Sequence, residues 1–517
     1  MNKILAALLA ALALGCATTE TAVPPAPPEK PAAPPPAPPA TPAPTPGSPP
    51  TPDAAFRAQQ PAPLPGTPTF DAPVPVVKKL KNGVEVWVVE NPAIPVVAVE
   101  VVIKSGVNAE PIEKAGLADL VVSLLDEGTR TRPADKLAEA IEDLAMRLNA
   151  NAGREDIRVH MNSLTEALPQ ALDLMADVLL NPAFRPEDVS RVKDQKITDL
   201  LQKKGVPQAL AADEMGRLLF GAKHPWGQPD GGTPETIRAI TPADLQKFHD
   251  TWFRPNNAVI VVSGDVKVDQ MVKMLDERLG AWKAKPLPKL SLPALPDLKA
   301  RTVTFVDMPN ASQSQVWVAG RVMNAKSPDA VVLRTINFAL GGMFTSRLNM
   351  NLREVHGYSY GVRSAVEAAR TYGTLMAYGG IVAKNTSEAL KEYEDELARF
   401  ASGGITGEEL AKSKNAFIRT MPSRLETNDA VASAYGTVAF YELGPDYYKT
   451  LPAKISAVTP ADATRVAKVV TAERWPVIIV GPAQENADKV KKLELGPVEL
   501  KAVPSSGGGA GSSVGVK

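Results

Sequence analysis

Two stretches of sequence decide the fold: ITPADLQKFHDTWFRPNNAVIVVSGD at residues 240–265 and VTPADATRVAKVVTAERWPVIIVGPA at residues 458–483. Each opens with Thr-Pro-Ala-Asp, which is typical of a helix start, and each ends in an apolar run that predicts a strand. Thr241 matches Thr459 and Val259 matches Val477, both 218 positions apart. A repeat this long exceeds any solenoid unit and indicates two copies of a whole domain.

The repeat sets the predicted domain boundaries. We expect the two copies at residues 76–290 and 300–497, joined by the proline-punctuated segment KAKPLPKLSLPALPDLKA. Residues 1–16 form a targeting segment, residues 17–75 a Pro-rich linker, and residues 498–517 a flexible tail rich in Gly and Ser.

Strands and helices are interspersed within the first copy. GVEVWVVEN and PVVAVEVVIKSG carry the β-branched content of paired strands and follow a KNG turn. EKAGLADLVVSLLDEG predicts one buried helix with Gly128 just past its end, and Pro133 starts an amphipathic helix. REDIRVHMNSL returns as a strand. The order predicts an α+β fold with helices packed on a mostly antiparallel sheet.

The N-terminus predicts export and lipidation. Lys3 precedes an apolar stretch that is too short to span a membrane, and the stretch ends at Cys16, the only cysteine. The segment resembles a bacterial lipoprotein signal, in which this thiol carries the lipid anchor. Ala17 follows it, which by the same resemblance favours the periplasmic face of the outer membrane. The alternative is an ordinary signal peptide with a chance cysteine.

Composition excludes several classes of function. Lys and Arg number 57 and Asp and Glu also 57, so net charge offers no argument for nucleic-acid binding. The four histidines are too far apart in sequence for a local metal-binding pair. We expect His160 to be a half-buried or surface strand residue, His224 and His249 to be structural, and His356 to lie in an exposed turn.

Several further motifs accompany the repeat: AGLADLVVSLLDEGT, FRPEDV, HPWGQPDGG and, in the second copy, FTSRLNMNLREVHGYSYGVRS. In this combination the sequence resembles the insulinase/pitrilysin-type zinc peptidases, including the mitochondrial processing peptidase subunits. The resemblance covers nearly all of the predicted folded part. It implies two homologous domains around a chamber, and it implies that two such halves pair.

The resemblance also locates the family's zinc motif, H-x-x-E-H, on the first helix of the first copy. Alignment places Asp119 and Ser123 at the two histidine positions, Val122 at the general base, and Asp199 near the downstream glutamate, with a helix register uncertain by one turn. Zinc sites of this type need imidazole and a proton acceptor. We therefore expect a degenerate site with no metal, no cofactor and no catalytic residue.

Two other uses of these residues compete with this interpretation. Asp119 and Asp199 could together hold another cation, but carboxylates on helices are more often solvated or ion-paired. Ser123 could act as a nucleophile, but it lies in an apolar helix with no histidine close in sequence. A small packing residue is the simpler interpretation.

The second copy keeps a pair of polar residues. Arg353 and Tyr360, in NLREVHGYSYG, match by spacing the Arg/Tyr pair with which family members bind a substrate carbonyl near the zinc. Positions one helical turn from Arg353 are not acidic, and the adjacent Glu354 is not expected to face it. This favours a substrate-binding role for Arg353 over a surface ion pair, whereas Tyr360 could equally be a strand residue packed on the sheet.

These observations predict a non-catalytic subunit of a heteromeric zinc peptidase in the cell envelope. Its expected partners are a zinc-bearing subunit of the family, a peptide substrate and the membrane through its lipid anchor, with no nucleic acid. Two alternatives remain open: an active zinc metalloendopeptidase with unrecognised ligands, and a structural, peptide-binding envelope lipoprotein.

Overall fold

The structure of the chain is a computed structural model that describes residues 69–298 and 300–503. Cys16, the targeting segment 1–16 and most of the Pro-rich linker lie outside the described residues, as does the end of the expected tail. Everything described belongs to one compact unit that begins at Thr67.

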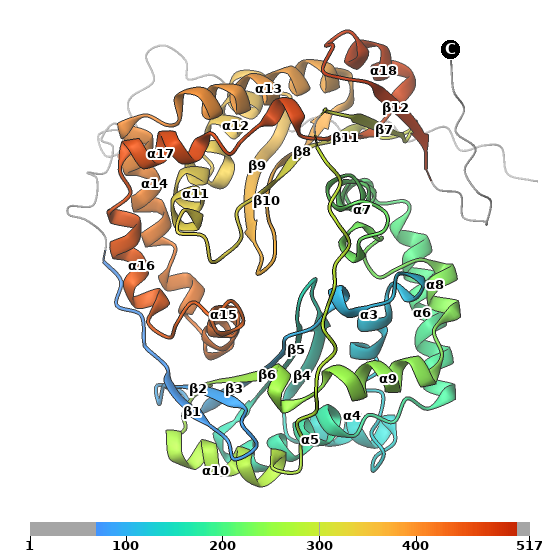
Figure 1. Cartoon of the computed structure of the whole chain (residues 1–517), viewed down its shortest axis with the longest axis vertical. Helices are drawn as coiled ribbons and strands as arrows, with labels where there is room; N and C mark the ends of the chain where they lie inside the picture. Colours follow the sequence, from blue (N-terminus) through green and yellow to red (C-terminus); the bar gives the residue numbers. More distant parts are fainter. Residues whose placement is uncertain (1–68, 299, 504–517) are drawn as a thin grey trace, which may run out of the picture. The chain divides into compact units, whose positions relative to one another are not determined.

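Each half of the described chain is built on a six-stranded sheet (Figure 1). The first sheet contains β1 (Val76–Lys79), β2 (Glu85–Glu90), β3 (Val96–Ile103), β4 (Arg147–Ala152), β5 (Ile157–Leu164) and β6 (Ala258–Gly264). The second contains β7 (Val303–Asp307), β8 (Gln313–Val322), β9 (Ser359–Ala368), β10 (Gly373–Val382), β11 (Val477–Gly481) and β12 (Val498–Ala502).

The two sheets share one strand order. The first runs β1-β2-β6-β3-β5-β4 and the second β12-β7-β11-β8-β10-β9, so five consecutive strands correspond one to one. In the first sheet, β2 and β6 form the single parallel pair. In the second sheet, β7 pairs in parallel with β11 on one side and with β12 on the other, and the other pairs are antiparallel. The predicted α+β fold of two homologous, mostly antiparallel copies is confirmed.

The helices follow the same repeat. The first half contains α3 (Leu117–Val122), α4 (Ala134–Asp143), α5 (Leu168–Leu180), α6 (Pro186–Lys203), α7 (Pro207–Phe220), α8 (Pro234–Ala239), α9 (Pro242–Trp252) and α10 (Val268–Leu279). The second contains α11 (Ala330–Asn337), α12 (Arg347–Asn349), α13 (Thr386–Gly403), α14 (Gly407–Arg419), α15 (Asn428–Phe440), α16 (Tyr447–Ser456), α17 (Pro460–Ala467) and α18 (Ala483–Lys491). Thr241 and Thr459 cap α9 and α17 with the same reciprocal box, formed with Asp244 and Asp462.

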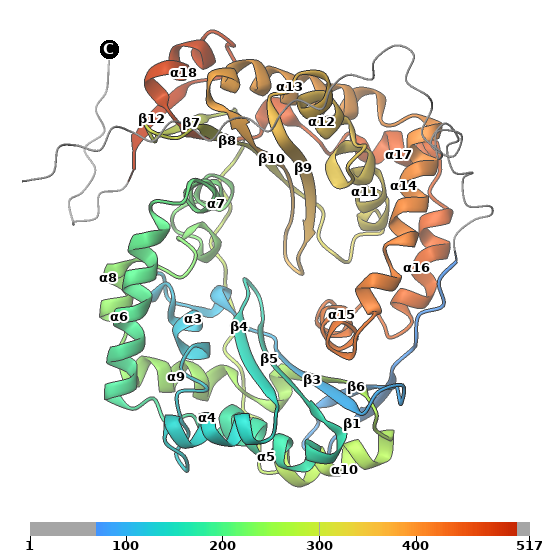
Figure 2. The same ribbon diagram turned by 180° about the vertical axis from the view of Figure 1, so that it is seen from behind.

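The central strands of each sheet are buried on both faces. Helices of its own half cover one face, and one helix of the other half lies on the opposite face: α15 on β3 and β6, and α7 on β8 and β11 (Figures 1 and 2). Under α15 the first sheet contributes the apolar side chains Trp87, Val89, Ala98, Val102, Val259 and Val261. Because α7 and α15 follow α6 and α14 at equivalent points of the repeat, the exchange is reciprocal.

Polar contacts fix α15 on the first sheet. The guanidinium of Arg158 donates to Thr437 Oγ1 at 3.0 Å and to the carbonyl oxygen of Ser433 at 3.2 Å. At the start of α15, Asn428 Nδ2 donates to the carbonyl oxygen of Val96 at 3.0 Å. These directed bonds set the position of the helix, whereas the apolar contacts beneath it provide most of the buried area.

One prediction about the first sheet is wrong. β2 and β3 are not paired with each other, because β6 lies between them and pairs with both. The KNG turn precedes β2 as predicted, and it joins β2 to the unpredicted strand β1, which pairs antiparallel with β2.

Two predicted boundaries are also wrong. The helix expected to run to Gly128 ends at Val122, and Leu124 and Leu125 continue in tighter turns. The tail expected from residue 498 begins as β12, whose backbone pairs in parallel with β7 at the sheet edge. The charged residues Glu499 and Lys501 interrupt the apolar pattern of this strand, so that pattern did not predict it.

No helix within residues 69–298 and 300–503 has the length and apolar character needed to cross a membrane.

Gly320 provides a test of this packing. A Cβ atom at Gly320 in β8 would lie 2.0 Å from Cε2 of Trp475, a buried ring without room to move. We expect Gly320→Ala to lower the free energy of unfolding by about 2 kcal/mol, in the range of overpacked cores. Gly403→Ala is the matched control, because a Cβ there meets nothing within 4 Å. Urea unfolding should leave the control unchanged or slightly stabilised; equal stability of both variants would contradict the packing described.

Candidate functional site

Helix α3 begins in a tight, buried turn. Gly116 has φ 91°, and a Cβ there would lie 2.4 Å from the carbonyl oxygen of Gly231, so the position requires glycine. The carboxyl group of Glu110 accepts hydrogen bonds from the backbone N–H of Gly116 at 2.9 Å and of Ala118 at 2.7 Å. Burial raises the pKa of Glu110 to about 8, against the opposing effect of these two donors.

Asp119 points from α3 toward α6 and forms an ion pair there. Its Oδ2 lies 2.7 Å from Lys196 Nζ, and the two side chains are 32% and 27% exposed. Asp119 thus already has a cationic partner supplied by the protein itself. The ammonium group of Lys196 occupies space beside the carboxylate that a bound cation would need.

The other two motif positions offer little to a metal. Val122 is buried and its side chain has no proton acceptor. Ser123 donates from Oγ to the backbone carbonyl oxygen of Asp119 at 2.8 Å. This bond competes with regular helix continuation and accompanies the end of α3 at Val122.

Asp199 does not join this group. It lies on α6 as an exposed residue, whereas Lys196, one helical turn earlier, faces α3. The structure therefore brings Asp119 and Ser123 together on α3, whereas Asp199 is an exposed residue of α6. The alternative in which Asp119 and Asp199 share a cation requires both carboxylates to face one ion. In the structure, Asp119 instead contacts Lys196 of α6.

The donor set on α3 does not fit the zinc ion that the resemblance implies. The site offers one paired carboxylate and one hydroxyl bonded to backbone, without imidazole, and zinc in proteins is held by nitrogen, sulfur and unpaired carboxylate ligands. Throughout the described residues, no cluster of three or more His, Cys, Asp or Glu residues could hold a metal ion.

Arg353 lies in a π-helical segment, Met350–Val355, and is partly exposed. Its guanidinium carbon lies 4.7 Å from the ring centroid of Phe344, which is 59% exposed. Nε also lies 3.5 Å from Oε1 of Glu354. The expectation that Glu354 does not face Arg353 is therefore wrong, because long side chains on the wide π-helical turn can reach each other. At this exposure the ion pair is weak and leaves Arg353 available.

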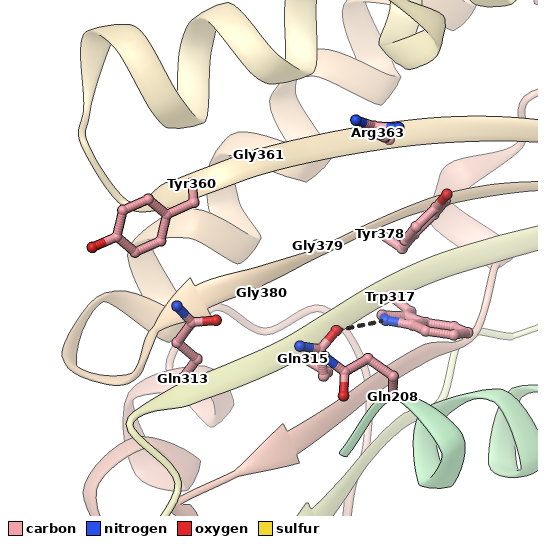
Figure 3. A pocket seen from close by; sticks show the side chains of 10 residues that line it. All are labelled: Gln208, Gln313, Gln315, Trp317, Tyr360, Gly361, Arg363, Tyr378, Gly379 and Gly380. Atoms are coloured by element: carbon pink, nitrogen blue, oxygen red, sulfur yellow. Dashed lines mark hydrogen bonds between the residues drawn. The ribbon is translucent and has the colours of Figure 1, made fainter. Parts of the chain in front are cut away.

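Tyr360 is the second residue of β9 and is 84% exposed, so it is not packed on the sheet. Its ring lies at one end of a cavity on the second sheet (Figure 3). No interaction among the described residues joins Tyr360 to Arg353, and Arg353 does not line this cavity.

His160 is half-buried in β5, as expected. Its Nε2 lies 2.6 Å from Oδ1 of Asp429 on α15, and Nδ1 lies 3.4 Å from Oε2 of the buried Glu100. Burial disfavours the charged ring, but the two carboxylates outweigh it and raise the pKa of His160. His160 thus strengthens the contact between α15 and the first sheet.

The remaining histidines serve packing and local bonding. His224 Nδ1 accepts a hydrogen bond from the backbone N–H of Trp226 at 3.1 Å, and His249 Nε2 lies 2.9 Å from the carbonyl oxygen of Leu179. Burial lowers the pKa of each ring to about 4. His356 is exposed and stacks on Tyr358 with ring centroids 4.9 Å apart.

Sequence reasoning missed Lys196 and Glu110. Lys196 lies three positions before Asp199. The alignment of this helix was uncertain by one turn, so Lys196 was within the range of residues that could face α3. Glu110 lies outside the aligned helix, and no pattern in the sequence connects it to Gly116 and Ala118.

Comparisons with known families give two matches along the chain. The model described as "Insulinase (Peptidase family M16)" matches residues 85–216, and the model "Peptidase M16 inactive domain" matches residues 239–417. Together they cover more than half of the 517 residues. The word "inactive" belongs to the second region, whereas Asp119, Val122 and Ser123 lie in the first.

Individual proteins agree with these matches. The chain is similar to an "Uncharacterized zinc protease" of Mycobacterium leprae, with 28% identity over 423 residues that cover 80% of this chain and 94% of that protein. It is 26% identical to the "Non-peptidase homolog YmxG" of Helicobacter pylori over 368 residues, 70% of this chain and 82% of that one. A crystal structure of a peptidase M16 inactive domain from Pseudomonas fluorescens shares the fold, with a TM-score of 0.74, 24% identity and coverage of 79% and 98%.

The buried carboxyl of Glu110 predicts a pH dependence of stability. Its pKa of about 8 in the folded chain lies above the ordinary value of 4.5. Between pH 4.5 and pH 8, the carboxyl group therefore keeps its proton in the folded chain and loses it in the unfolded chain. This contribution to stability is complete below about pH 4.5 and is lost as the pH rises toward 8. We therefore expect the stability of the parent chain, relative to Glu110→Gln, to fall from pH 5 to pH 8.

Urea unfolding at several pH values checks this expectation. Glu113→Gln, at an exposed position on the same segment, should run parallel to the parent across the range. A constant difference between the parent and Glu110→Gln would contradict the assignment.

Proposed function

Because the chain belongs to the insulinase family of peptidases (peptidase family M16), we propose that it is a non-catalytic subunit of a heteromeric zinc peptidase in the cell envelope. In this proposal it binds an extended peptide and completes the chamber of the enzyme. A separate family subunit supplies the zinc ion and performs the cleavage.

The ion pair between Asp119 and Lys196 is the observation that carries the proposal. At 2.7 Å it places a positive charge of the protein beside the only carboxylate on α3. Binding zinc there would require breaking this pair and bringing two cations close together, without an imidazole to compensate. Val122 adds the second deficit, since loss of a general base alone typically costs about 10²- to 10⁴-fold in rate.

The names of relatives do not decide the question, because they include both zinc proteases and a non-peptidase homolog. The residues of this chain favour the latter.

Two features of the second half support peptide binding. β9 is an edge strand of its sheet and therefore presents unpaired backbone groups, to which an extended peptide can add. Tyr360 at the start of β9 and Arg353 in the preceding segment both reach solvent. Their hydroxyl and guanidinium donors suit a peptide carbonyl oxygen that is being polarised by a partner's zinc.

The location rests on the sequence alone. The segment 1–16 with Cys16 at its end supports export and a lipid anchor, and Ala17 supports the periplasmic face of the outer membrane. The Pro-rich stretch that follows connects the proposed anchor to the folded part.

Zinc content tests the first half of the proposal. The purified parent chain should carry no stoichiometric zinc and no peptidase activity. The triple variant Asp119→His, Ser123→His, Lys196→Glu removes the ammonium group and provides two imidazoles and a carboxylate on facing helices, so we expect it to bind close to one zinc per chain. Elemental analysis after dialysis measures both. Chelator-sensitive peptidase activity in the isolated parent chain would overturn the proposal.

Arg353→Ala tests the second half. In a complex with a zinc-bearing family subunit, we expect this variant to slow peptide cleavage at least about tenfold, because a donor to the substrate carbonyl is lost. Arg419→Ala, which removes another exposed arginine at the end of α14, is the matched control and should leave turnover unchanged. Unchanged turnover with Arg353→Ala would instead favour a structural, peptide-binding lipoprotein.

A further inference from the structure

A cavity of about 420 Å³ opens over the second sheet, between the start of α7 and strands β8, β9 and β10 (Figure 3). This size lies in the usual range of about 300–1,000 Å³ for binding pockets, and it exceeds the need of a single small side chain. Nothing in the proposed contact of Arg353 with a peptide uses it.

The strand register explains the shape of the cavity. Tyr378 of β10 lies directly opposite Arg363 of β9 on one side and Trp317 of β8 on the other, so three large side chains form one row across the sheet. Two residues along, Gln315 of β8 lies opposite Gly380 of β10. Because side chains two positions apart share a face, the missing side chain of Gly380 leaves a hollow beside the row.

The floor at Gly380 is covered by the ends of two flexible side chains, Gln313 and Gln315. A Cβ atom there would lie 2.6 Å from Oε1 of Gln313 and 3.2 Å from Nε2 of Gln315, so even a methyl group would fill the space between these amides. Glycine inside a strand commonly marks a place where a ligand or a second backbone approaches closely.

The polar lining complements a peptide backbone. Gln315 Oε1 accepts a hydrogen bond from Trp317 Nε1 at 3.3 Å, which leaves the amide N–H groups of Gln315 free to donate into the cavity. The side chains of Gln208 on α7 and Gln313 on β8 make no hydrogen bond with any residue of the described chain. Figure 3 shows Gln208 beside Gln315 and Trp317, at the opposite end from Tyr360. Side-chain amides both donate and accept, as peptide groups do.

Arg363 is the only charged residue among the ten that line the cavity. It is exposed, and within residues 69–298 and 300–503 it has neither an ion pair nor a hydrogen-bond partner. A guanidinium group binds a carboxylate through two parallel hydrogen bonds and is weakly hydrated, which suits it to this role.

We propose that this cavity binds an acidic stretch of the extended peptide. The peptide backbone lies over Gly380 and exchanges hydrogen bonds with the glutamine amides, and an Asp or Glu carboxylate of the peptide binds Arg363. Tyr378 and Trp317, whose ring centroids are 5.6 Å apart, provide the apolar wall for a neighbouring side chain. The inference rests on the proposed peptide-binding function and names the kind of peptide that is preferred.

Fluorescence anisotropy with the purified chain tests the preference. The probes are a labelled heptapeptide, Ser-Ala-Phe-Glu-Ala-Ser-Ala, and its twin in which Gln replaces Glu. We expect the parent to bind the Glu peptide about tenfold more tightly, as for one hydrogen-bonded charge pair. Arg363→Gln should abolish this difference while leaving the affinity for the Gln peptide and the thermal stability unchanged.

Two further variants separate charge recognition from general effects. Arg419→Gln removes an exposed arginine outside the cavity and should keep the tenfold preference. Gly380→Ala should weaken both peptides alike, because it fills the floor without changing the charge.

Each remaining outcome has a defined meaning. Equal affinity of the parent for the two peptides, or an equal loss for both with Arg363→Gln, would overturn the acidic preference while peptide binding survives. Binding of neither peptide, even when the zinc-bearing subunit is present, would overturn peptide binding by this chain and the inference with it.

Discussion

The exchange of α7 and α15 between the two halves is the constraint on which the rest of the structure depends. Both sheets contain central strands buried on both faces, and each half provides only enough helices to cover one face of its own sheet. The second cover must therefore come from the other half. The same exchange brings Gln208, at the start of α7, to the rim of the cavity on the second sheet.

Helix α3 is held in place by contacts of the protein alone. A lysine of α6, Lys196, pairs with Asp119 at 2.7 Å. The start of α3 is held separately by Glu110 and by the glycine turn at Gly116. Because neither depends on a metal, α3 keeps its place against the first sheet.

Much of the architecture could be predicted from the sequence, because a repeat of this length is visible in a single chain and Thr241 and Thr459 mark equivalent helix starts. The strand order could not be predicted, because β6 lies between β2 and β3 although it follows them by more than 150 residues. The local sequence pattern of a strand does not indicate which distant strand it pairs with. The motif positions on α3 were located through the resemblance. Lys196 was missed because one turn of helix register separates it from Asp199. The row formed by Arg363, Tyr378 and Trp317 exists only after three strands align, so no spacing in the sequence indicated it.

The helix exchange also has a consequence for the order of events at the ribosome. The last strand of the first sheet ends at Gly264, but the helix that shields its second face starts at Asn428, 164 residues later. At about 5–20 residues per second, translation leaves Trp87 and its neighbours without their cover for roughly ten to thirty seconds. Until α15 has been synthesised, the apolar side chains of this face stay in contact with water, although the folded chain buries them.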